Sequence, residues 1–289
     1  MSMSLTRQQF SVLSGFEEYD DTCIEDFDKT IINELESKGL LMDGKVTESG
    51  IKALEPYRVK RAVFIAAGLG KRLAPVTINT PKPLVRVHGV RIIDRLIDAC
   101  LQAGIVEIYI VRGYLSEQFD QLLIKYPMIK FIENTVYTEA NNISSAFIAK
   151  ELLSNAYVFE ADLLISNPTI ITKYHYSSDY LAIKKDSTDD WCFRVKDGII
   201  MEEMTKGAGQ DIWQMVGISY WDKSDGEKLS KDIEKVYHSE GGKDLYWEQV
   251  PLCYRKENYK VAIRECLQED IVEIDTFEEL KAIDKAYAV

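Results

Sequence analysis

The sequence lacks the features that mark secreted, zinc-binding and membrane-spanning proteins. Its five cysteines are scattered, and no two stand in a C-x-x-C spacing, so neither a disulfide framework nor a zinc site is indicated. No apolar stretch is long enough to span a bilayer, and the first residues show no charged segment followed by an apolar one. We therefore expect a cytoplasmic protein with free thiols and no membrane partner.

Positive charge and histidine are also scarce. The 289 residues carry 47 Asp and Glu against 35 Lys and Arg, and the net charge of −12 disfavours a general attraction to DNA or RNA. The three histidines, His88, His175 and His238, stand in no motif, so we assign them no catalytic role. Apolar residues, in contrast, make up 46% of the chain, which is enough for a large core.

The first 58 residues differ from the rest, and we expect them to form a domain of their own. Apolar periodicity predicts helices over 8–16 and 27–37. A short hairpin over 40–47 and a helix from Glu48 to Pro56 follow. This order of elements resembles a winged helix-turn-helix domain.

The charge of this segment argues against DNA binding. Residues 1–58 carry six Lys and Arg but twelve Asp and Glu, seven of which gather between residues 17 and 28. A sequence-specific DNA reader needs a basic face that displaces counterions from the phosphates. We therefore expect this domain to dock onto the rest of the chain, to dimerise it or to sense an effector, and a homodimer stays open.

From residue 59 to 289 the pattern predicts a second, catalytic α/β domain. Short buried strands alternate with amphipathic helices at a spacing typical of parallel βαβ units. The expected strands cover 63–66, 107–111, 130–133 and 156–159, and the expected helices cover 91–103, 116–126 and 144–153. Such alternation indicates a doubly wound, mostly parallel, Rossmann-like sheet that binds its ligands beyond the carboxyl ends of the strands.

The strongest chemical signal follows the first of these strands. It is the nineteen-residue stretch AAGLGKRLAPVTINTPKPL, from residue 66 to residue 84. Small residues around Gly68 and Gly70 let backbone N–H groups approach an anion. Lys71 and Arg72 add positive charge, and Lys82 stands on a stiff Pro-Lys-Pro loop. The spacing matches neither G-x-G-x-x-G nor the P-loop, so a triphosphate site of another kind is indicated.

This stretch resembles the signature of the sugar-nucleotidyltransferase superfamily, G-x-G-x-R-(x)n-P-K-P-L. The resemblance implies that the loop and its basic pair bind the phosphates of a nucleoside triphosphate, and that Arg72 and Lys82 act at the reacting centre. The residues that we assign to the nucleotide phosphates are Ala66, Ala67, Gly68, Gly70, Lys71 and Arg72.

Two acidic segments are expected to bind Mg²⁺. Asp162 follows the strand over 156–159, where the superfamily places a metal-binding aspartate. A late segment supplies partners, because alternation along a strand puts Glu273 and Asp275 on one side. Hard carboxylate oxygens with room for substrate phosphates suit this ion, so Asp162, Glu273 and Asp275 are the predicted ligands.

Aromatic and acidic residues in the second half of the chain suggest the acceptor. Trp191, Tyr246 and Trp247 stand beside carboxylates, an arrangement that holds a quaternary ammonium by cation–π attraction. Residues 62–284 also resemble the bacterial CTP:phosphocholine cytidylyltransferases, in segments such as VRGYLSEQFD, YTEANNISS, DDW and DLYWEQ. That resemblance implies CTP and phosphocholine as the substrates.

The same resemblance assigns further site residues, beginning with the three aromatic residues around the choline. The carboxylates expected to balance the choline charge are Asp190, Asp244 and Glu248. The lysines of which one is expected to contact the acceptor phosphate are Lys184 and Lys185. The residues expected near the base and ribose of CTP are Gly113, Tyr114, Asn142 and Ser144.

The expected reaction is in-line attack by the phosphate oxygen of phosphocholine on the α-phosphorus of CTP, with release of pyrophosphate. That oxygen is already anionic near neutral pH, so no general base is needed. The alternatives are a cytidylyltransferase for phosphoethanolamine or 2-aminoethylphosphonate, and a sugar-1-phosphate nucleotidyltransferase. The non-enzyme alternative is a transcription regulator that senses CDP-choline through an inactive transferase domain.

Overall fold

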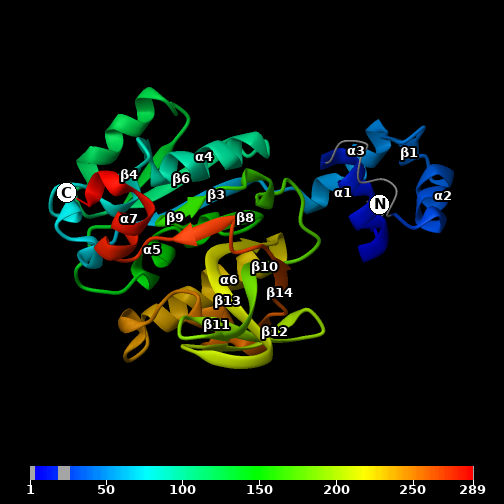
Figure 1. The fold of residues 1–289 in the computed structure, drawn as a ribbon. Coiled ribbons are helices and arrows are strands. Elements are labelled where there is room, and N and C mark those ends of the chain that lie inside the picture. Colours follow the sequence, from blue (N-terminus) through cyan, green and yellow to red (C-terminus); the bar gives the residue numbers. More distant parts are fainter. Residues whose placement is uncertain (1–3, 19–26, 289) are drawn as a thin grey trace. The chain divides into compact units, whose positions relative to one another are not determined.

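The computed structural model describes residues 4–18 and 27–288, which divide into two compact units (Figure 1). The smaller unit holds Met1–Val59 together with Thr172–Tyr176, and the larger holds Lys60–Ile171 and Ser177–Val289. Much of the expected acidic cluster, namely Asp20, Asp21, Glu25 and Asp26, lies outside the described residues. No helix in the described part of the chain is long and apolar enough to cross a membrane.

The smaller unit contains the elements that the sequence predicted, in the predicted order. They are α1 (Arg7–Glu18), α2 (Lys29–Ser37), the hairpin of β1 (Leu41–Met42) with β2 (Lys45–Val46), and α3 (Glu48–Leu54). The start of α2 is set by Asp28, which accepts a hydrogen bond from the Thr30 backbone N–H, and α3 is capped in the same way by Thr47. Apolar side chains from all three helices form the core of this unit.

Residues 172–176, far away in the sequence, complete that core. Tyr174 is only 4% exposed, and the ring of Tyr176 stacks on that of Tyr57 with a centroid distance of 5.6 Å. A backbone hydrogen bond adds to these contacts, because the N–H of Val59 donates to the carbonyl of Lys173 over 2.9 Å. The smaller unit is therefore built from two separate stretches of chain, which the sequence did not indicate.

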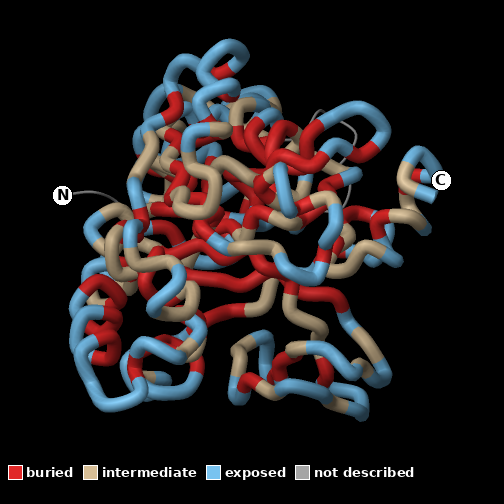
Figure 2. The backbone as a smooth tube through the Cα atoms, turned by 90° about the vertical axis from the view of Figure 1, so that its left-hand side faces the viewer, coloured by how far each residue is buried: buried red, intermediate tan, exposed pale blue. Residues whose placement is uncertain are grey.

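The larger unit is organised around a nine-stranded sheet. Its central strands β7 (Lys130–Glu133), β6 (Glu107–Arg112), β3 (Arg61–Ala66) and β8 (Ala156–Glu160) run parallel, in that order, and all four were predicted. β3 and β8 are mostly buried, because they carry almost only apolar side chains, and buried segments cross the middle of the molecule in Figure 2. This is the mostly parallel, Rossmann-like arrangement that the sequence predicted.

The outer part of the sheet was not predicted. β13 (Gly207–Trp221) runs antiparallel to β8, and beyond it lie β11 (Cys192–Lys196), β12 (Ile199–Met204), β14 (Ala262–Glu265) and β10 (Asp179–Thr188). Because β10 also pairs with β13, these five strands close on themselves. Two short strands, β9 (Leu163–Ile165) and β15 (Ile271–Glu273), pair just beyond β8.

Helices and turns connect these strands. The remaining regular elements are α4 (Ile92–Gln102), α5 (Ile143–Ile148), α6 (Lys223–Tyr237), α7 (Phe277–Ile283) and the hairpin of β4 (Arg86–Val87) with β5 (Val90–Arg91). Two expected helices differ from the prediction. The segment Ser116–Ile124 is a run of 3₁₀ turns, and α5 ends after six residues, where a 3₁₀ turn over Lys150–Leu152 replaces its last part.

The dependence of the smaller unit on residues 172–176 predicts a local effect of one substitution. Tyr174→Ala removes a buried aromatic side chain and should destabilise this unit by about 3 kcal/mol. Hydrogen exchange should then quicken in α1, α2 and α3, while β3, β6 and β8 keep their protection. Tyr254→Ala, at a tyrosine that is 53% exposed, is the control. Unchanged exchange in the three helices would contradict the role given to this segment.

Candidate active site

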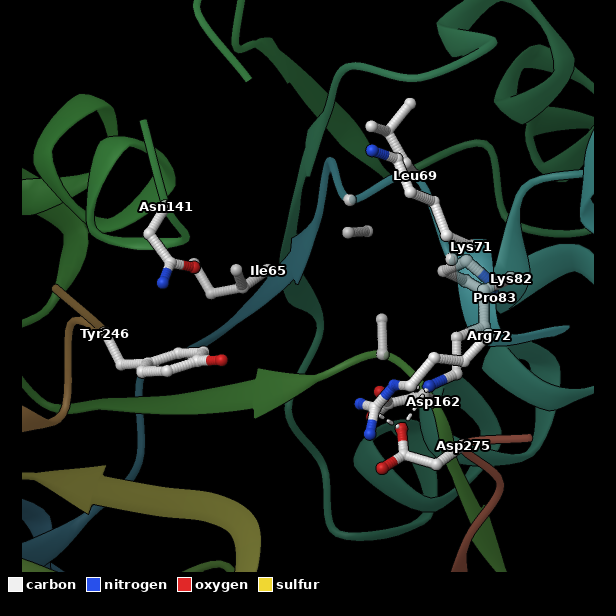
Figure 3. A pocket seen from close by; sticks show the side chains of 14 residues that line it. Ile65, Leu69, Lys71, Arg72, Lys82, Pro83, Asn141, Asp162, Tyr246 and Asp275 are labelled. Carbon is white, nitrogen blue, oxygen red and sulfur yellow. Dashed lines mark hydrogen bonds and ion pairs between the residues drawn. The ribbon is translucent and has the colours of Figure 1, made fainter. Parts of the chain in front are cut away.

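Lys82 lies at the centre of the site, between two carboxylates (Figure 3). Its Nζ is 2.8 Å from Oδ2 of Asp162 and 2.8 Å from Oδ1 of Asp275. Arg72 donates to the same Asp275 oxygen over 2.8 Å. Burial lowers the pKa of Lys82, but the two carboxylates outweigh that effect and raise its pKa above the ordinary value, so Lys82 is charged near neutral pH. Four residues predicted to act together thus meet in space.

The glycine-bearing loop passes directly beside Lys82. Gly70 has a φ of +58°, and a Cβ placed on it would lie 3.0 Å from the Cβ of Lys82 and 3.2 Å from the Cγ2 of Thr77. The hydroxyl of Thr77 donates to the Gly70 carbonyl over 2.8 Å. Glycine is therefore favoured at this position both by the left-handed backbone and by the close approach of the lysine.

Two cavities adjoin this loop. The larger has a volume of about 630 Å³, the smaller one of about 230 Å³, and both are lined by Ile65, Gly68, Leu69 and Asn141. The predicted residues in the lining of the larger cavity are Ala66, Gly68, Gly70, Lys71, Arg72, Lys82, Asp162, Tyr246 and Asp275. Those in the lining of the smaller cavity are Ala67, Gly68, Asn142 and Ser144.

Two residues expected near the base and ribose have other positions. Tyr114 lines neither cavity, because its hydroxyl donates to the backbone carbonyls of Thr77 and Ile78 and thereby braces the loop before Lys82. Gly113 leaves room for the ring of Tyr137, since a Cβ there would lie 2.8 Å from the ring. Tyr137 itself lines the smaller cavity and was missed, although the run YTEANN that begins with it had been noticed.

Three carboxylates form a cluster that could hold a divalent metal ion. Oxygen atoms of Glu160, Asp162 and Glu273 all lie within 4.8 Å of one another. Asp275, predicted to join them, instead has its Oδ1 bonded to Lys82 and Arg72, and Glu160 takes the third place in the cluster. Glu160 was missed although its position, two residues before Asp162 at the end of β8, was a usable signal.

The electrostatics of this cluster fit a cation. Burial raises the pKa of Glu273 to about 10, with Asp162 and Glu160 contributing further, and burial raises the pKa of Glu160 well above its usual range. Oδ1 of Asp162 is buried and has no hydrogen-bond partner in the described part of the chain. Three neighbouring carboxyl groups, with one buried oxygen that has no partner among the described residues, suit a divalent ion, which prefers hard oxygen ligands.

The predicted aromatic cage is only partly present. Trp191 and Tyr246 lie with their ring centroids 5.7 Å apart, and the ring of Tyr246 points toward the larger cavity (Figure 3). Trp247 does not join them. It is 1% exposed and packs against Trp221 in the core, at the turn that follows Tyr246. We therefore no longer assign Trp247 to the acceptor site.

The charged residues that were predicted near the acceptor differ in their exposure and position. Glu248 is buried, and burial followed by the nearby Glu203 carboxyl raises the pKa of Glu248 to about 8. Asp190 and Asp244 are exposed. The residues that line neither cavity are Lys184, whose ammonium lies over the Trp213 ring, and Lys185, which donates to Gln268.

Comparison with known proteins agrees with this site. Residues 61–189 match the model of the nucleotidyl transferase family. The chain is 38% identical to a 2-aminoethylphosphonate cytidylyltransferase of Lancefieldella rimae, over 78% of this chain and 92% of that protein. The chain belongs to the nucleotidyl transferase family.

Within the family, the chain is close to bacterial cytidylyltransferases. A choline-phosphate cytidylyltransferase of Streptococcus pneumoniae is 33% identical, over 78% of this chain and 97% of the relative. A solved structure of CTP:phosphocholine cytidylyltransferase from the same organism matches with a TM-score of 0.72, covering 79% of this chain and 99% of that one. Cytidylyltransferase activity is therefore supported, and the relatives differ in the acceptor that they name.

The raised pKa values predict that metal binding is linked to proton release. A carboxyl with a pKa of about 10 is protonated near neutral pH, and it must lose its proton to become a ligand. Mg²⁺ affinity should therefore rise from about pH 6 to about pH 8, and titration calorimetry in buffers of different ionisation enthalpy should show protons released. Asp162→Asn should weaken binding strongly, whereas Glu240→Gln, at an exposed acid, should not. A pH-independent affinity would contradict the cluster as the metal site.

Proposed function

We propose that the chain is a Mg²⁺-dependent cytidylyltransferase that joins CTP to a small amine bearing a phosphate or a phosphonate group. The observation that supports this proposal most strongly is the position of Lys82. It forms ion pairs with Asp162 and Asp275, next to the glycine-bearing loop and Arg72. This arrangement places positive charge and possible metal-binding carboxylates around one cavity. Transfer of a nucleotidyl group from a nucleoside triphosphate requires both.

Each group has a role in the proposed reaction. The loop N–H groups around Gly68, with Lys71 and Arg72, bind the triphosphate, and Lys82 stabilises the charge that develops at the α-phosphate. A bound Mg²⁺ would neutralise phosphate charge at Glu160, Asp162 and Glu273. An acceptor oxygen, already anionic near neutral pH, forms a bond to the α-phosphorus while the bond to the bridging oxygen breaks and pyrophosphate leaves.

We place 2-aminoethylphosphonate first among the acceptors. The relative named for it shares 38% of its residues with this chain, against 33% for the choline-phosphate enzyme. With Trp247 in the core, two of the three expected cage aromatics remain. A primary ammonium needs fewer aromatic faces than a quaternary one, since it can donate hydrogen bonds to carboxylates.

Phosphocholine, the acceptor expected from the sequence, is the second candidate. It is favoured by the ring pair of Trp191 and Tyr246, whose aromatic faces attract a cation that cannot donate hydrogen bonds.

For the smaller unit we propose a winged-helix-like fold that does not read DNA. Its helices and hairpin stand in the order typical of such domains. Residues 1–58 carry twice as many acidic as basic residues, twelve against six, which opposes binding to phosphate backbones.

Pyrophosphate release tests the proposed reaction directly. CTP should support turnover with 2-aminoethylphosphonate, and to a smaller extent with phosphocholine, in the presence of Mg²⁺. UTP, dTTP and ATP serve as nucleotide controls, and phosphoethanolamine and glucose-1-phosphate serve as acceptor controls. Preference for phosphocholine would reverse the order of the two candidates, and turnover with glucose-1-phosphate alone would overturn the assignment to amines.

A substitution in the ring pair of Trp191 and Tyr246 should distinguish an acceptor with a quaternary ammonium from one with a primary ammonium. Tyr246→Ala should raise KM for phosphocholine about tenfold, because a cation–π contact with a partly buried ring is lost. KM for 2-aminoethylphosphonate should rise less, and KM for CTP should stay near its original value. Equal increases for both acceptors would show that the ring contributes packing and not charge recognition, and Tyr254→Ala controls for loss of a surface tyrosine.

A further inference from the structure

Two adjacent asparagines join the segment that lines the smaller cavity to the segment that carries Tyr246. We call residues 243–248 the acceptor segment. The backbone N–H of Asn141 donates to the carbonyl of Lys243 over 2.8 Å, and its side-chain Nδ2 donates to the carbonyl of Asp244 over 3.2 Å. Asn141 therefore holds the beginning of the acceptor segment through two hydrogen bonds.

Asn142 holds the end of the same segment. Its Oδ1 accepts a hydrogen bond from the backbone N–H of Trp247 over 2.9 Å, and its side chain also bonds to the carboxyl of Glu248. Its Nδ2 lies 3.5 Å from Oε1 of Glu160, a member of the acidic cluster. One amide group thus touches both the acceptor segment and the carboxylates proposed for the metal.

These contacts are the connection between the two segments. Among the described residues, every hydrogen bond between 134–145 and 243–248 involves Asn141 or Asn142. Asn141 lines both cavities and Asn142 lines the smaller one, while Tyr246 lines the larger (Figure 3). Any ligand that fixes the two asparagines from the smaller cavity must also fix the segment that bears Tyr246.

Further hydrogen bonds hold the two asparagines on the side of the smaller cavity. The hydroxyl of Ser144 donates to the carbonyl of Asn141 over 2.8 Å, and Nδ2 of Asn134 donates to Ser144 and Ser145 over 2.9 Å each. These three side chains also line the smaller cavity. The polar network around that cavity therefore extends, without a break, into the acceptor segment.

We propose that Asn141 and Asn142 are positioning residues through which nucleotide bound at the smaller cavity increases the affinity for the acceptor. This inference rests on the proposed function, since it needs a nucleotide and an amine acceptor as the two ligands. The nucleotide orders the asparagines, and the ordered asparagines hold Tyr246 where the ammonium binds. The coupling is reciprocal, so the acceptor increases nucleotide affinity by the same factor.

The test is a linkage measurement on the full chain. A CTP analogue with a methylene group between the α- and β-phosphorus blocks transfer, and the acceptor is whichever of 2-aminoethylphosphonate and phosphocholine turned over with CTP. Titration of the acceptor with and without the analogue gives the coupling factor. For the original chain we expect a factor of about tenfold, a typical size for coupling between two sites.

The variants should change this factor in a graded way. Asn142→Ala should bring it close to one, because all side-chain bonds to Trp247, Glu248 and Glu160 are lost. Asn142→Asp keeps an acceptor oxygen for the Trp247 N–H but loses the amide donor. Asn141→Ala loses the bond to Asp244 and the bond that Asn141 Oδ1 accepts from the Asn142 N–H, but it keeps the backbone bond to Lys243, so intermediate factors are expected for both variants. The control Asn258→Ala removes a comparable side-chain bond, to Asp232, and should leave the factor unchanged.

The outcomes separate this inference from the proposed function. Turnover with neither amine would refute the proposed function before any linkage is measured. Turnover with a coupling factor of one in the original chain, or an equal factor in all three asparagine variants, would overturn the positioning role alone. If Asn142→Ala does not fold, Asn142→Asp and Asn141→Ala still decide the question.

Discussion

The ammonium of Lys82 stands between carboxylates from two distant parts of the chain, and the geometry of the whole site depends on it. Asp162 follows β8 and Asp275 follows β15, so the lysine fixes the distance between two strand ends and the loop that carries it. Without that charge, two carboxylates would face each other in a partly buried site, which costs free energy. Gly70 is constrained by the same residue, because a Cβ at position 70 would lie only 3.0 Å from the Cβ of Lys82.

The site holds more partly buried carboxyl groups than cations to pair with them. One lysine, 12% exposed at its side chain, faces Asp162, Asp275 and the cluster of Glu160 and Glu273. Since the folded-state pKa of Glu273 lies far above its unfolded value, the protein without metal loses stability as pH rises between the two values. A divalent ion supplies the missing positive charge. The folded protein is therefore less stable without the ion, and binding of the ion restores that stability.

The sequence indicated which residues gather around Lys82 but not how the aromatic residues near residue 246 are placed, for physical reasons. The central strands and the loop around Lys82 are local patterns of small, apolar and basic residues, and these can be recognised without knowing what packs nearby. The separate positions of Tyr246 and Trp247 depend on which side of an irregular segment faces the core, and no pattern of adjacent aromatic residues reveals that. The entry of residues 172–176 into the smaller unit depends on contacts between distant stretches, which leave no periodic signal.

The larger unit contains two kinds of sheet, and the residues proposed for the reaction and those proposed for the acceptor lie near different ones. The groups proposed to act on the phosphates follow β3, β8 and β15, at the parallel end of the structure, whereas Trp191 precedes β11 of the closed antiparallel strands and Tyr246 lies beyond α6. Substitutions in the second part can alter recognition of an ammonium group without moving Lys82. Relatives at 38% and 33% identity that are named for different acceptors fit such a division. The proposed function needs both parts to act on one substrate pair, and the bonds of Asn141 and Asn142 link the lining of the smaller cavity to the segment that carries Tyr246.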